Sequence, residues 1–324
     1  MEIYALTVTY NSSEKLEKCI KNILSQSLTL KKVIIVDNAS NEVHKNKIDK
    51  ISKLNNNIEV LFMEENYGGA GGFYYGIKHI IENYDSDWIW LMDDDAYPDE
   101  NCLRNLVQDV NVNTGACLPL IYGIDREKYQ FYHYKIVSNN LYTYSNPINE
   151  LNINQDIFII DSGAFVGPLI KTSVISDIGY PDKDLFIYGD DFEFLYRLSR
   201  KYDLIVKTNA IINHNDPIIN NSIEIRLYNI WKEYYKYRNA VLFVMKYSRS
   251  RLDKFVNKFQ IKKEIVIISL KTIFEFGTPI YYKVKRIKYI SKGYSDGIHG
   301  KIGKTIDPQK FINEIKIYAE KYKK

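Results

Sequence analysis

A short apolar run that ends in three consecutive aspartates constrains the fold of this chain more than any other feature. The run is Trp88–Met92, and Asp93, Asp94 and Asp95 follow it directly. Its length and composition predict a strand buried on both faces. Ligands of open α/β sheets bind outside the carboxyl ends of strands, so the aspartates would lie at a binding edge. Adjacent carboxylates repel one another, and a divalent cation would remove that cost. A solvated acidic turn is the alternative interpretation.

Strand and helix patterns alternate in the segments before the aspartates. Apolar, β-rich runs cover Ile3–Thr9, Lys32–Val36 and Ile58–Met63, and an apolar stripe with helical spacing follows the first of them. This order predicts a mostly parallel sheet with helices on both faces. Polar residues follow the first two runs at 10–13 and 37–40. Each set could be an ordinary turn, but together they could line one crevice for a nucleoside.

A glycine-rich segment follows the third run. Asn66–Phe73 holds four glycines within five residues, and we expect a helix over Tyr74–Asn83 after it. Free N–H groups and the positive end of a helix dipole at this junction would suit a diphosphate. The segment lacks the spacing of a Walker loop or of a dinucleotide-binding motif, and a flexible turn is the alternative.

A second acidic pair lies about one hundred residues further along the chain. Asp190 and Asp191 open a helix predicted to run to about Lys201. Acids at a helix N-terminus are favoured by the dipole, so helix capping is one interpretation and catalysis the other. His214 follows a predicted strand, Leu204–Ile212. It could be a structural histidine or a further ligand of Mn²⁺ or a similar ion.

The remaining predicted elements are a helix over Glu100–Val110, a strand over Gly115–Ile121, a hairpin with a long loop over 123–155, a strand over Ile157–Ile160, a helix over Lys171–Ile178, one long helix over Glu224–Tyr247, a loop over Gly293–Lys304 and a final helix over Pro308–Tyr322.

Two basic blocks lie in the last third, at 246–263 and 283–304, and each has seven Lys or Arg against one Asp. With their interleaved aromatic residues, they indicate either helices on an anionic membrane surface or a helical subdomain or oligomer contact with a solvated face.

Composition narrows the class of protein. A chain of 324 residues with 45% apolar content can bury a sizeable core in one or two domains. A net charge of +4 gives no reason to expect nucleic acid as a partner. Three cysteines without paired spacing are typical of a reducing compartment. With no signal-peptide pattern and no apolar run near ~20 residues, we expect a cytoplasmic protein, with a peripheral place on the inner face of the membrane as an option.

Taken in order, the motifs resemble inverting family 2 glycosyltransferases with a GT-A fold, over roughly residues 1–245. The motifs are Val8–Asn11, Val36–Ser40, Asn66–Phe73, Asp93–Asp95, Gly189–Asp191 and Asn213-His214. Within the family, Asn66–Phe73 and Met92–Asp95 are most similar to bacterial galactofuranosyltransferases. Tyr234-Tyr235 and Arg238-Asn239 resemble a feature of rhamnosyltransferase-like members. The resemblance implies a GT-A catalytic domain over residues 1–222 and a C-terminal helical, basic and aromatic region over 223–324.

The resemblance also implies roles for single residues. Asp191 would be the general base, and Asp190 would support it or orient the acceptor. Asp93, Asp95 and His214 would hold a divalent metal, Mn²⁺ rather than Mg²⁺. The nucleotide-sugar donor would contact Thr9, Tyr10, Asn11, Asp37, Asn38, Asn66, Gly69, Gly72, Asp93 and Asp94.

The sequence thus predicts a metal-dependent inverting glycosyltransferase. It would move galactofuranose from UDP-galactofuranose onto a glycan or polyprenyl-linked acceptor in cell-surface polysaccharide synthesis. A rhamnosyltransferase that uses dTDP-rhamnose is the alternative on the same fold. A nucleotidyltransferase would need a basic phosphate-binding motif, which Tyr10–Ser13 lacks, and a non-catalytic sugar-binding module would not need Asp191. Assembly as a homo-oligomer is an open expectation.

Overall fold

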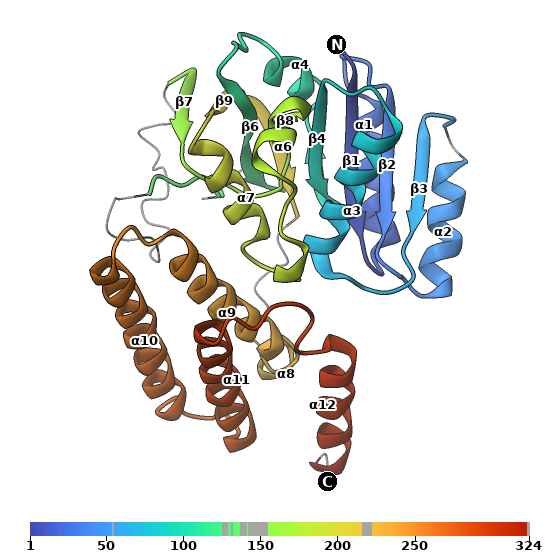
Figure 1. The fold of residues 1–324 in the computed structure, drawn as a ribbon. Helices are drawn as coiled ribbons and strands as arrows, with labels where there is room; N and C mark the ends of the chain where they lie inside the picture. Colours follow the sequence, from blue (N-terminus) through green and yellow to red (C-terminus); the bar gives the residue numbers. More distant parts are fainter. Residues whose placement is uncertain are drawn as a thin grey trace. The chain divides into compact units, whose positions relative to one another are not determined.

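The computed structural model describes residues 1–53, 55–124, 129–130, 132–136, 141, 155–215 and 222–322 (Figure 1). The chain divides into two compact units, which we call the sheet unit and the helical unit. The sheet unit comprises Met1–Ile136, Asn146–Lys183 and Asp190–Asp216. The helical unit comprises Val137–Ser145, Asp184–Gly189 and Pro217–Lys324.

The sheet unit is built on one mixed sheet. Among the described residues, nine strands join in the order β3-β2-β1-β4-β8-β6-β9-β5, and β7 pairs with β9. The strands are β1 (Ile3–Thr9), β2 (Lys32–Asp37), β3 (Ile58–Phe62), β4 (Trp88–Asp93), β5 (Ala96–Pro98), β6 (Thr114–Gly123), β7 (Ile157–Ile160), β8 (Leu169–Lys171) and β9 (Asp203–His214). The half from β3 to β4 is parallel, as is the β6–β9 pair, whereas β5, β7 and β8 pair antiparallel. The predicted α/β class is confirmed.

Helices cover both faces of this sheet (Figure 1). They are α1 (Ser13–Leu24), α2 (Glu42–Ser52), α3 (Gly68–Asn83), α4 (Cys102–Leu106), α6 (Thr172–Ile178) and α7 (Asp190–Ser199). Successive side chains of a strand point to opposite faces. Ile3 and Ala5 of β1 therefore pack in one core with α1, α2 and α4, and Tyr4 and Leu6 pack in the other with α3, α6 and α7. Burial on both faces explains why the strands are continuous apolar runs.

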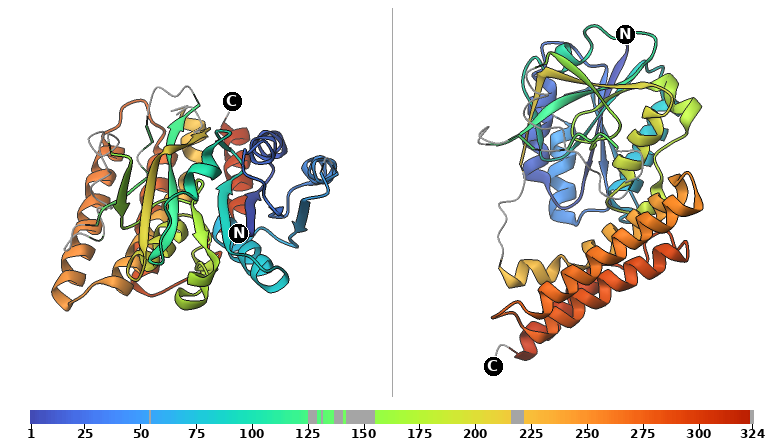
Figure 2. Two further views of the ribbon diagram at one scale, coloured as in Figure 1. Left: turned by 90° about the horizontal axis from the view of Figure 1, so that it is seen from above. Right: turned by 90° about the vertical axis from the view of Figure 1, so that its left-hand side faces the viewer.

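The helical unit consists of helices around an aromatic core. Its helices are α8 (Ile223–Tyr228), α9 (Ile230–Tyr247), α10 (Arg251–Ile273), α11 (Ile280–Ile298) and α12 (Pro308–Tyr322), and the 3-10 turn η1 (Lys183–Leu185) lies at its border. Helix α11 packs against both α9 and α10 (Figure 2). Tyr234, Tyr235 and Tyr282 form much of the core. No described helix is both long and apolar enough to cross a bilayer.

Several predicted boundaries were wrong. The predicted helix over Glu224–Tyr247 is broken at Asn229, whose side-chain amide donates to the carbonyl of Ile225 at 3.0 Å and so competes with the helix. The helix predicted over Glu100–Val110 is the shorter α4. The hairpin predicted over 123–155 lies largely outside the described residues.

The segment Gly293–Lys304 was predicted to be a loop, but α11 continues through it to Ile298. A Cβ added at Gly293 would lie 2.3 Å from the carbonyl oxygen of Tyr234, and one at Gly297 would lie 2.7 Å from that of Arg238. These glycines therefore let α11 approach the backbone of α9 closely. Glycine content predicts a loop locally, and helix packing overrides that tendency here.

Replacing Gly293 with alanine should destabilise the helical unit, because the added methyl group meets backbone that cannot rotate away. We expect Gly293→Ala to lower the free energy of unfolding by about 1–3 kcal/mol, as overpacking does. Ser291→Ala on an exposed position of the same helix is the control and should change it by less than about 0.5 kcal/mol. Urea denaturation measures both, and equal stability of the two variants would contradict the packing role.

Candidate active site

The three aspartates lie at the carboxyl end of β4, in the middle of the sheet. Asp93 is the last residue of β4, and Asp94 and Asp95 form the turn into β5. Strand β5 pairs antiparallel with β9, and this register sets Ala96 opposite His214. The imidazole Nε2 of His214 consequently lies 3.2 Å from Asp95 Oδ1. Strand pairing thus joins two groups that are far apart in the sequence.

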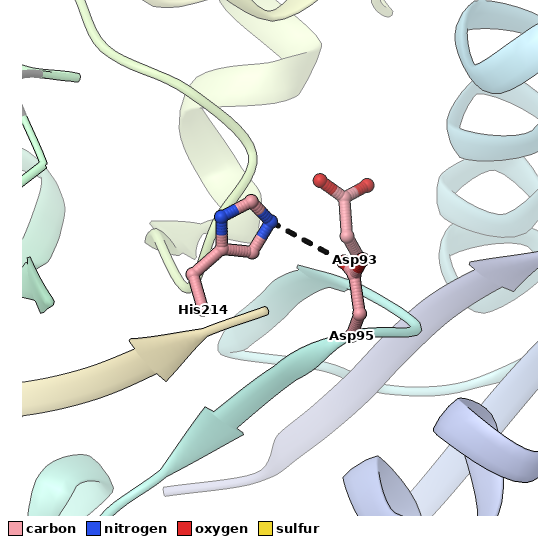
Figure 3. Close-up of side chains that lie close together, drawn as sticks. All are labelled: Asp93, Asp95 and His214. Atoms are coloured by element: carbon pink, nitrogen blue, oxygen red, sulfur yellow. Dashed lines mark ion pairs between the residues drawn. The ribbon is translucent and has the colours of Figure 1, made fainter. Parts of the chain in front are cut away.

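Asp93, Asp95 and His214 form a cluster that fits a divalent cation. Each offers one ligand atom, and these atoms all lie within 4.8 Å of one another. Figure 3 shows the imidazole facing the Asp95 carboxylate, with the Asp93 carboxylate beside them. His214 is buried, and the two aspartates are partly exposed. A set of two carboxylate oxygens and one imidazole nitrogen suits Mn²⁺ or a related ion.

The second ring nitrogen of His214 has its own partner. Its Nδ1 lies 3.0 Å from Oε1 of Gln130. An amide oxygen accepts a hydrogen bond from Nδ1–H, so a neutral ring would offer the lone pair of Nε2 to a cation, whereas a protonated ring donates from Nε2 to Asp95. Metal-binding histidines are usually oriented in this way by a second group. Gln130 was not predicted from the sequence, where no local pattern marks it.

The pKa values of the three aspartates in the turn are shifted from their usual range, and burial is the main cause at Asp93 and Asp94. Removal from water, reinforced by the neighbouring carboxylates, raises the pKa of Asp93 to about 7. Burial likewise raises the pKa of Asp94 to about 6. Burial would also raise the pKa of Asp95, but hydrogen bonds and charge from His214 and Lys15 outweigh it, so this pKa is lowered. The turn therefore holds negative charge at a cost that a bound cation would relieve.

Lys15 is a site residue that the sequence analysis missed. Its Nζ lies 3.0 Å from Asp95 Oδ2, so a cation from α1 approaches the cluster. A signal for it existed in the sequence. Lys15 lies in the first turn of a helix, where the dipole disfavours a positive charge unless a nearby anion compensates.

The ends of β1 and β2 supply further polar groups. Thr9 Oγ1 donates to Asp94 Oδ2 at 2.6 Å, which links β1 to the aspartate turn. Asp37 is fully buried, and its Oδ1 accepts from the Ser40 N–H at 3.2 Å. Its Oδ2 has no hydrogen-bond partner among the described residues. A buried acceptor without a partner is uncommon, and it is suited to an N–H or O–H group of a ligand.

The other residues predicted to bind the donor already have hydrogen bonds within the protein. The Asn38 amide accepts from the Tyr67 N–H at 3.0 Å and donates to the Gly68 carbonyl at 2.8 Å. Asn66 Oδ1 accepts from the Gly68 N–H at 2.8 Å, and Asn11 Oδ1 accepts from that of residue 41 at 2.8 Å. These bonds shape the loops at the strand ends. Tyr10 is 42% exposed and presents its ring to solvent.

The glycine-rich segment differs from its prediction. Helix α3 begins at Gly68 rather than at Tyr74, so the glycines lie within its first turns. A Cβ at Gly72 would lie 2.4 Å from Val8 Cγ1, which shows that this glycine lets α3 pack against β1. At Gly69 no atom lies within 4 Å of such a Cβ. The first turn of α3 is therefore open at Gly69, where helix N–H groups lack partners in the helix.

The second acidic pair begins α7. Asp190 is buried, and burial together with the Asp191 charge holds the pKa of Asp190 well above its usual range. Asp191 Oδ1 accepts from the Phe192 N–H at 2.7 Å. The Asp191 charge also acts on Asp93, and the Asp93 charge acts on Asp190. The sheet unit thus brings both acidic groups within electrostatic reach of each other.

A cation-competent cluster at the strand ends of an α/β sheet, with a separate acidic pair at the start of a helix, suits the transfer of a group from a nucleotide donor. Residues 4–179, more than half of the chain, match the sequence profile described as Glycosyl transferase family 2. The chain therefore belongs to this family, which confirms the resemblance seen in its motifs.

Individual relatives add detail. The chain is 27% identical over 206 residues to galactofuranosyltransferase GlfT1 of Mycolicibacterium smegmatis, a match that covers 61% of this chain and 65% of that protein. It is 21% identical over 317 residues to the low-salt glycan biosynthesis hexosyltransferase Agl10 of Haloferax volcanii, with 95% and 94% covered. A crystal structure of GalNAc-T7 with UDP, GalNAc and Mn²⁺ superposes with a TM-score of 0.56 at 17% identity, covering 84% of this chain and 58% of that one. This likeness supports the GT-A fold.

The raised pKa of Asp93 makes the stability of the metal-free protein depend on pH. The folded state binds a proton more tightly than the unfolded state, so this stabilisation is complete below about pH 4 and is lost as pH rises through about 7. With EDTA present, we expect the midpoint of thermal unfolding to fall between pH 5 and pH 8. In Asp93→Asn the fall should be smaller by about 3 °C, which corresponds to roughly 1 kcal/mol.

Differential scanning fluorimetry at the two pH values measures this effect. Asp85→Asn, on an exposed position just before β4, is the control and should behave as wild type. An identical fall in wild type and Asp93→Asn would contradict the raised pKa of Asp93.

Proposed function

We propose that this chain is a metal-dependent inverting glycosyltransferase that transfers galactofuranose from UDP-galactofuranose to a glycan or polyprenyl-linked acceptor. The observation that carries the proposal is the cluster of Asp93, Asp95 and His214 beside the separate pair Asp190 and Asp191. Membership of the family supports the reaction type. The galactofuranosyltransferase relatives support the donor.

The donor would lie along the ends of β1, β2 and β4. The unpartnered Oδ2 of Asp37 would accept a hydrogen bond from the N–H of a pyrimidine base. Thr9, Tyr10, Asn11 and Asn38 would complete the nucleoside contacts. Asn66 precedes α3 and Gly69 lies in its first turn, where the dipole favours the diphosphate, whereas Gly72 lies one turn further on and packs against Val8 of β1.

The metal cluster would act on the leaving group. A cation held by Asp93, Asp95 and His214 would neutralise the charge that grows on the departing diphosphate. Asp94 is held by Thr9 and would face the nucleoside side of the turn. The imidazole ligand favours Mn²⁺ over Mg²⁺, which prefers oxygen ligands.

The acidic pair would serve the acceptor. In the proposed step, the acceptor oxygen forms a bond to the anomeric carbon on the face opposite the nucleotide. The bond from that carbon to the diphosphate breaks, and UDP leaves with the electron pair. The hydroxyl proton passes to the carboxylate of Asp191. Burial and the Asp191 charge favour the protonated form of Asp190, so in this proposal Asp191 acts as the base.

Replacing Asp191 with asparagine should separate donor binding from transfer, because asparagine keeps the shape and removes the base. We expect kcat for sugar transfer to fall by at least about 100-fold in Asp191→Asn. The Kd for UDP in the presence of Mn²⁺, measured by calorimetry, should stay within about threefold of wild type, since this residue is not in the metal cluster.

Asp85→Asn is the matched control and should keep both values. Transfer at the wild-type rate by Asp191→Asn would contradict its role as base. An equal loss of UDP binding and transfer would instead indicate a general structural role.

We further propose that the helical unit contacts an anionic membrane surface, where a polyprenyl-linked acceptor would be found. Around the turn between α10 and α11, Phe274, Phe276 and Ile280 are 73%, 100% and 79% exposed. Helix α10 carries lysines at positions 254, 258, 262, 263 and 271. Lys271 lies within one turn of Phe274, and the other lysines lie further along α10. A basic helix that ends in exposed aromatic side chains is typical of helices that insert shallowly into anionic lipid.

The double variant Phe274→Ser/Phe276→Ser should weaken membrane binding without unfolding the chain, because both side chains are exposed. In flotation assays with phosphatidylglycerol vesicles, we expect the bound-to-free ratio to fall at least about tenfold, because two aromatic side chains would no longer insert into the lipid. Val112→Ser, which changes an exposed apolar residue of the sheet unit, should bind as wild type. Equal binding by all three proteins would favour a role of this turn in packing or oligomer contacts.

A further inference from the structure

The segment between η1 and α7 has a strained backbone. Phe186, Tyr188 and Gly189 have positive φ angles of 67°, 64° and 89°. Bulky side chains rarely adopt this conformation. Such strain persists only where the surroundings enforce it, and it is concentrated at functional sites. The segment Asp184–Gly189 belongs to the helical unit, and Gly189 is bonded directly to Asp190 of the sheet unit.

Asn239 of α9 holds this segment through its side-chain amide. Its Nδ2 lies 3.0 Å from the carbonyl oxygen of Leu185, 2.9 Å from that of Ile187 and 2.7 Å from that of Tyr188. Asn239 itself is buried, and the Leu185 carbonyl also accepts from the Ile187 N–H at 2.8 Å. One side chain thus contacts the backbone before Phe186, between the strained residues and at Tyr188.

Arg238 orients that amide. Its Nε donates to Asn239 Oδ1 at 2.8 Å, which forces the NH₂ group of Asn239 to face the carbonyl groups. Its Nη2 donates to the Leu185 carbonyl at 2.8 Å, and its Nη1 donates to Thr305 Oγ1 at 3.2 Å. Arg238 has no exposed surface. A fully buried guanidinium is costly, and Arg238 offsets that cost with hydrogen bonds to the carbonyl groups of Asp184 and Leu185 in the segment and to Gly303 and Thr305 outside it.

Tyr235 completes the contact one turn earlier on α9. Its ring lies 5.0 Å from the ring of the buried Phe186, between centroids. Residues three and four apart lie on one face of a helix. Tyr235, Arg238 and Asn239 therefore lie on one face of α9 and contact the segment Asp184–Gly189. The function proposed above gives this face of α9 no role.

We propose that Arg238 and Asn239 are positioning residues for Asp191. By holding Asp184–Gly189, they fix the direction in which the chain enters α7, whose first two residues are Asp190 and Asp191. This inference rests on the proposed role of Asp191 as base. It predicts that Arg238 and Asn239 affect sugar transfer and not donor binding, because the donor contacts come from the ends of β1, β2 and β4.

The test uses Asn239→Ala and Asn239→Asp in the full chain. The aspartate has the same shape, but it turns a carboxylate oxygen toward the carbonyl groups. With UDP-galactofuranose and Mn²⁺, we expect kcat to fall about 100-fold in both variants, as a displacement of about 1 Å at a reacting group can cause. The Kd for UDP with Mn²⁺ should stay within about threefold of wild type. The control is Asn257→Ala, a buried asparagine of α10 whose amide donates to the Asp253 carbonyl at 2.8 Å, and it should keep kcat.

A second readout does not depend on activity. Hydrogen exchange of the amides of residues 185–191 should become faster in Asn239→Ala and remain as in wild type in Asn257→Ala. Faster exchange with unchanged kcat would overturn the positioning role, as would a parallel loss of UDP binding and kcat. If the wild-type chain transfers no sugar, the proposed function fails and the positioning role fails with it. In that case unchanged exchange would also show that Asn239 does not hold the segment.

Discussion

Repulsion among partly buried carboxylates at the end of β4 is the constraint on which the rest of the site depends. The strand carries Asp93 to the edge of the sheet, and burial raises its pKa to about 7. The pairing of β5 with β9 brings His214 against Asp95, and α1 brings Lys15 to the same carboxylate. The fold thus assembles the lysine side chain and the imidazole ring around the acids. A cation would supply the remaining compensation.

The two acidic groups would divide the work of a displacement reaction. In the proposed function, one cluster would stabilise the leaving diphosphate, and the other would provide a carboxylate for the attacking hydroxyl. Burial and the charge of Asp191 raise the pKa of Asp190, and in the proposed function Asp191 is the carboxylate that acts as the base. In the proposed positioning role, the helical unit acts on Asp191 through the segment before α7. The buried side chains of Arg238 and Asn239 hold that segment in a strained conformation.

Local patterns predicted those parts of the fold that depend on near neighbours in the sequence. Apolar runs predicted the strands β1, β2 and β4. The rule that ligands bind at strand ends then marked the polar residues at those ends as candidates for the site. Gln130 was missed because only the path of its loop brings it to His214, and Lys15 was missed although its place in the first turn of α1 indicated a nearby anion. Gly72 and Gly293 were assigned to loops because glycine has the same local signature in a turn and in a close helix contact. Tertiary packing decides between the two, and a single sequence does not contain that information locally.

The most direct test of the central claim is nucleotide release from a panel of donors. The protein would be incubated with UDP-galactofuranose, UDP-galactopyranose, UDP-glucose or dTDP-rhamnose, in Mn²⁺ or in EDTA, together with membrane extract as a source of acceptor. Release of UDP from UDP-galactofuranose in Mn²⁺, abolished by EDTA, is the result that this account predicts. Turnover of dTDP-rhamnose alone would keep the reaction and correct the donor. Release that persists in EDTA, or no metal-dependent release or binding of any nucleotide, would contradict the account.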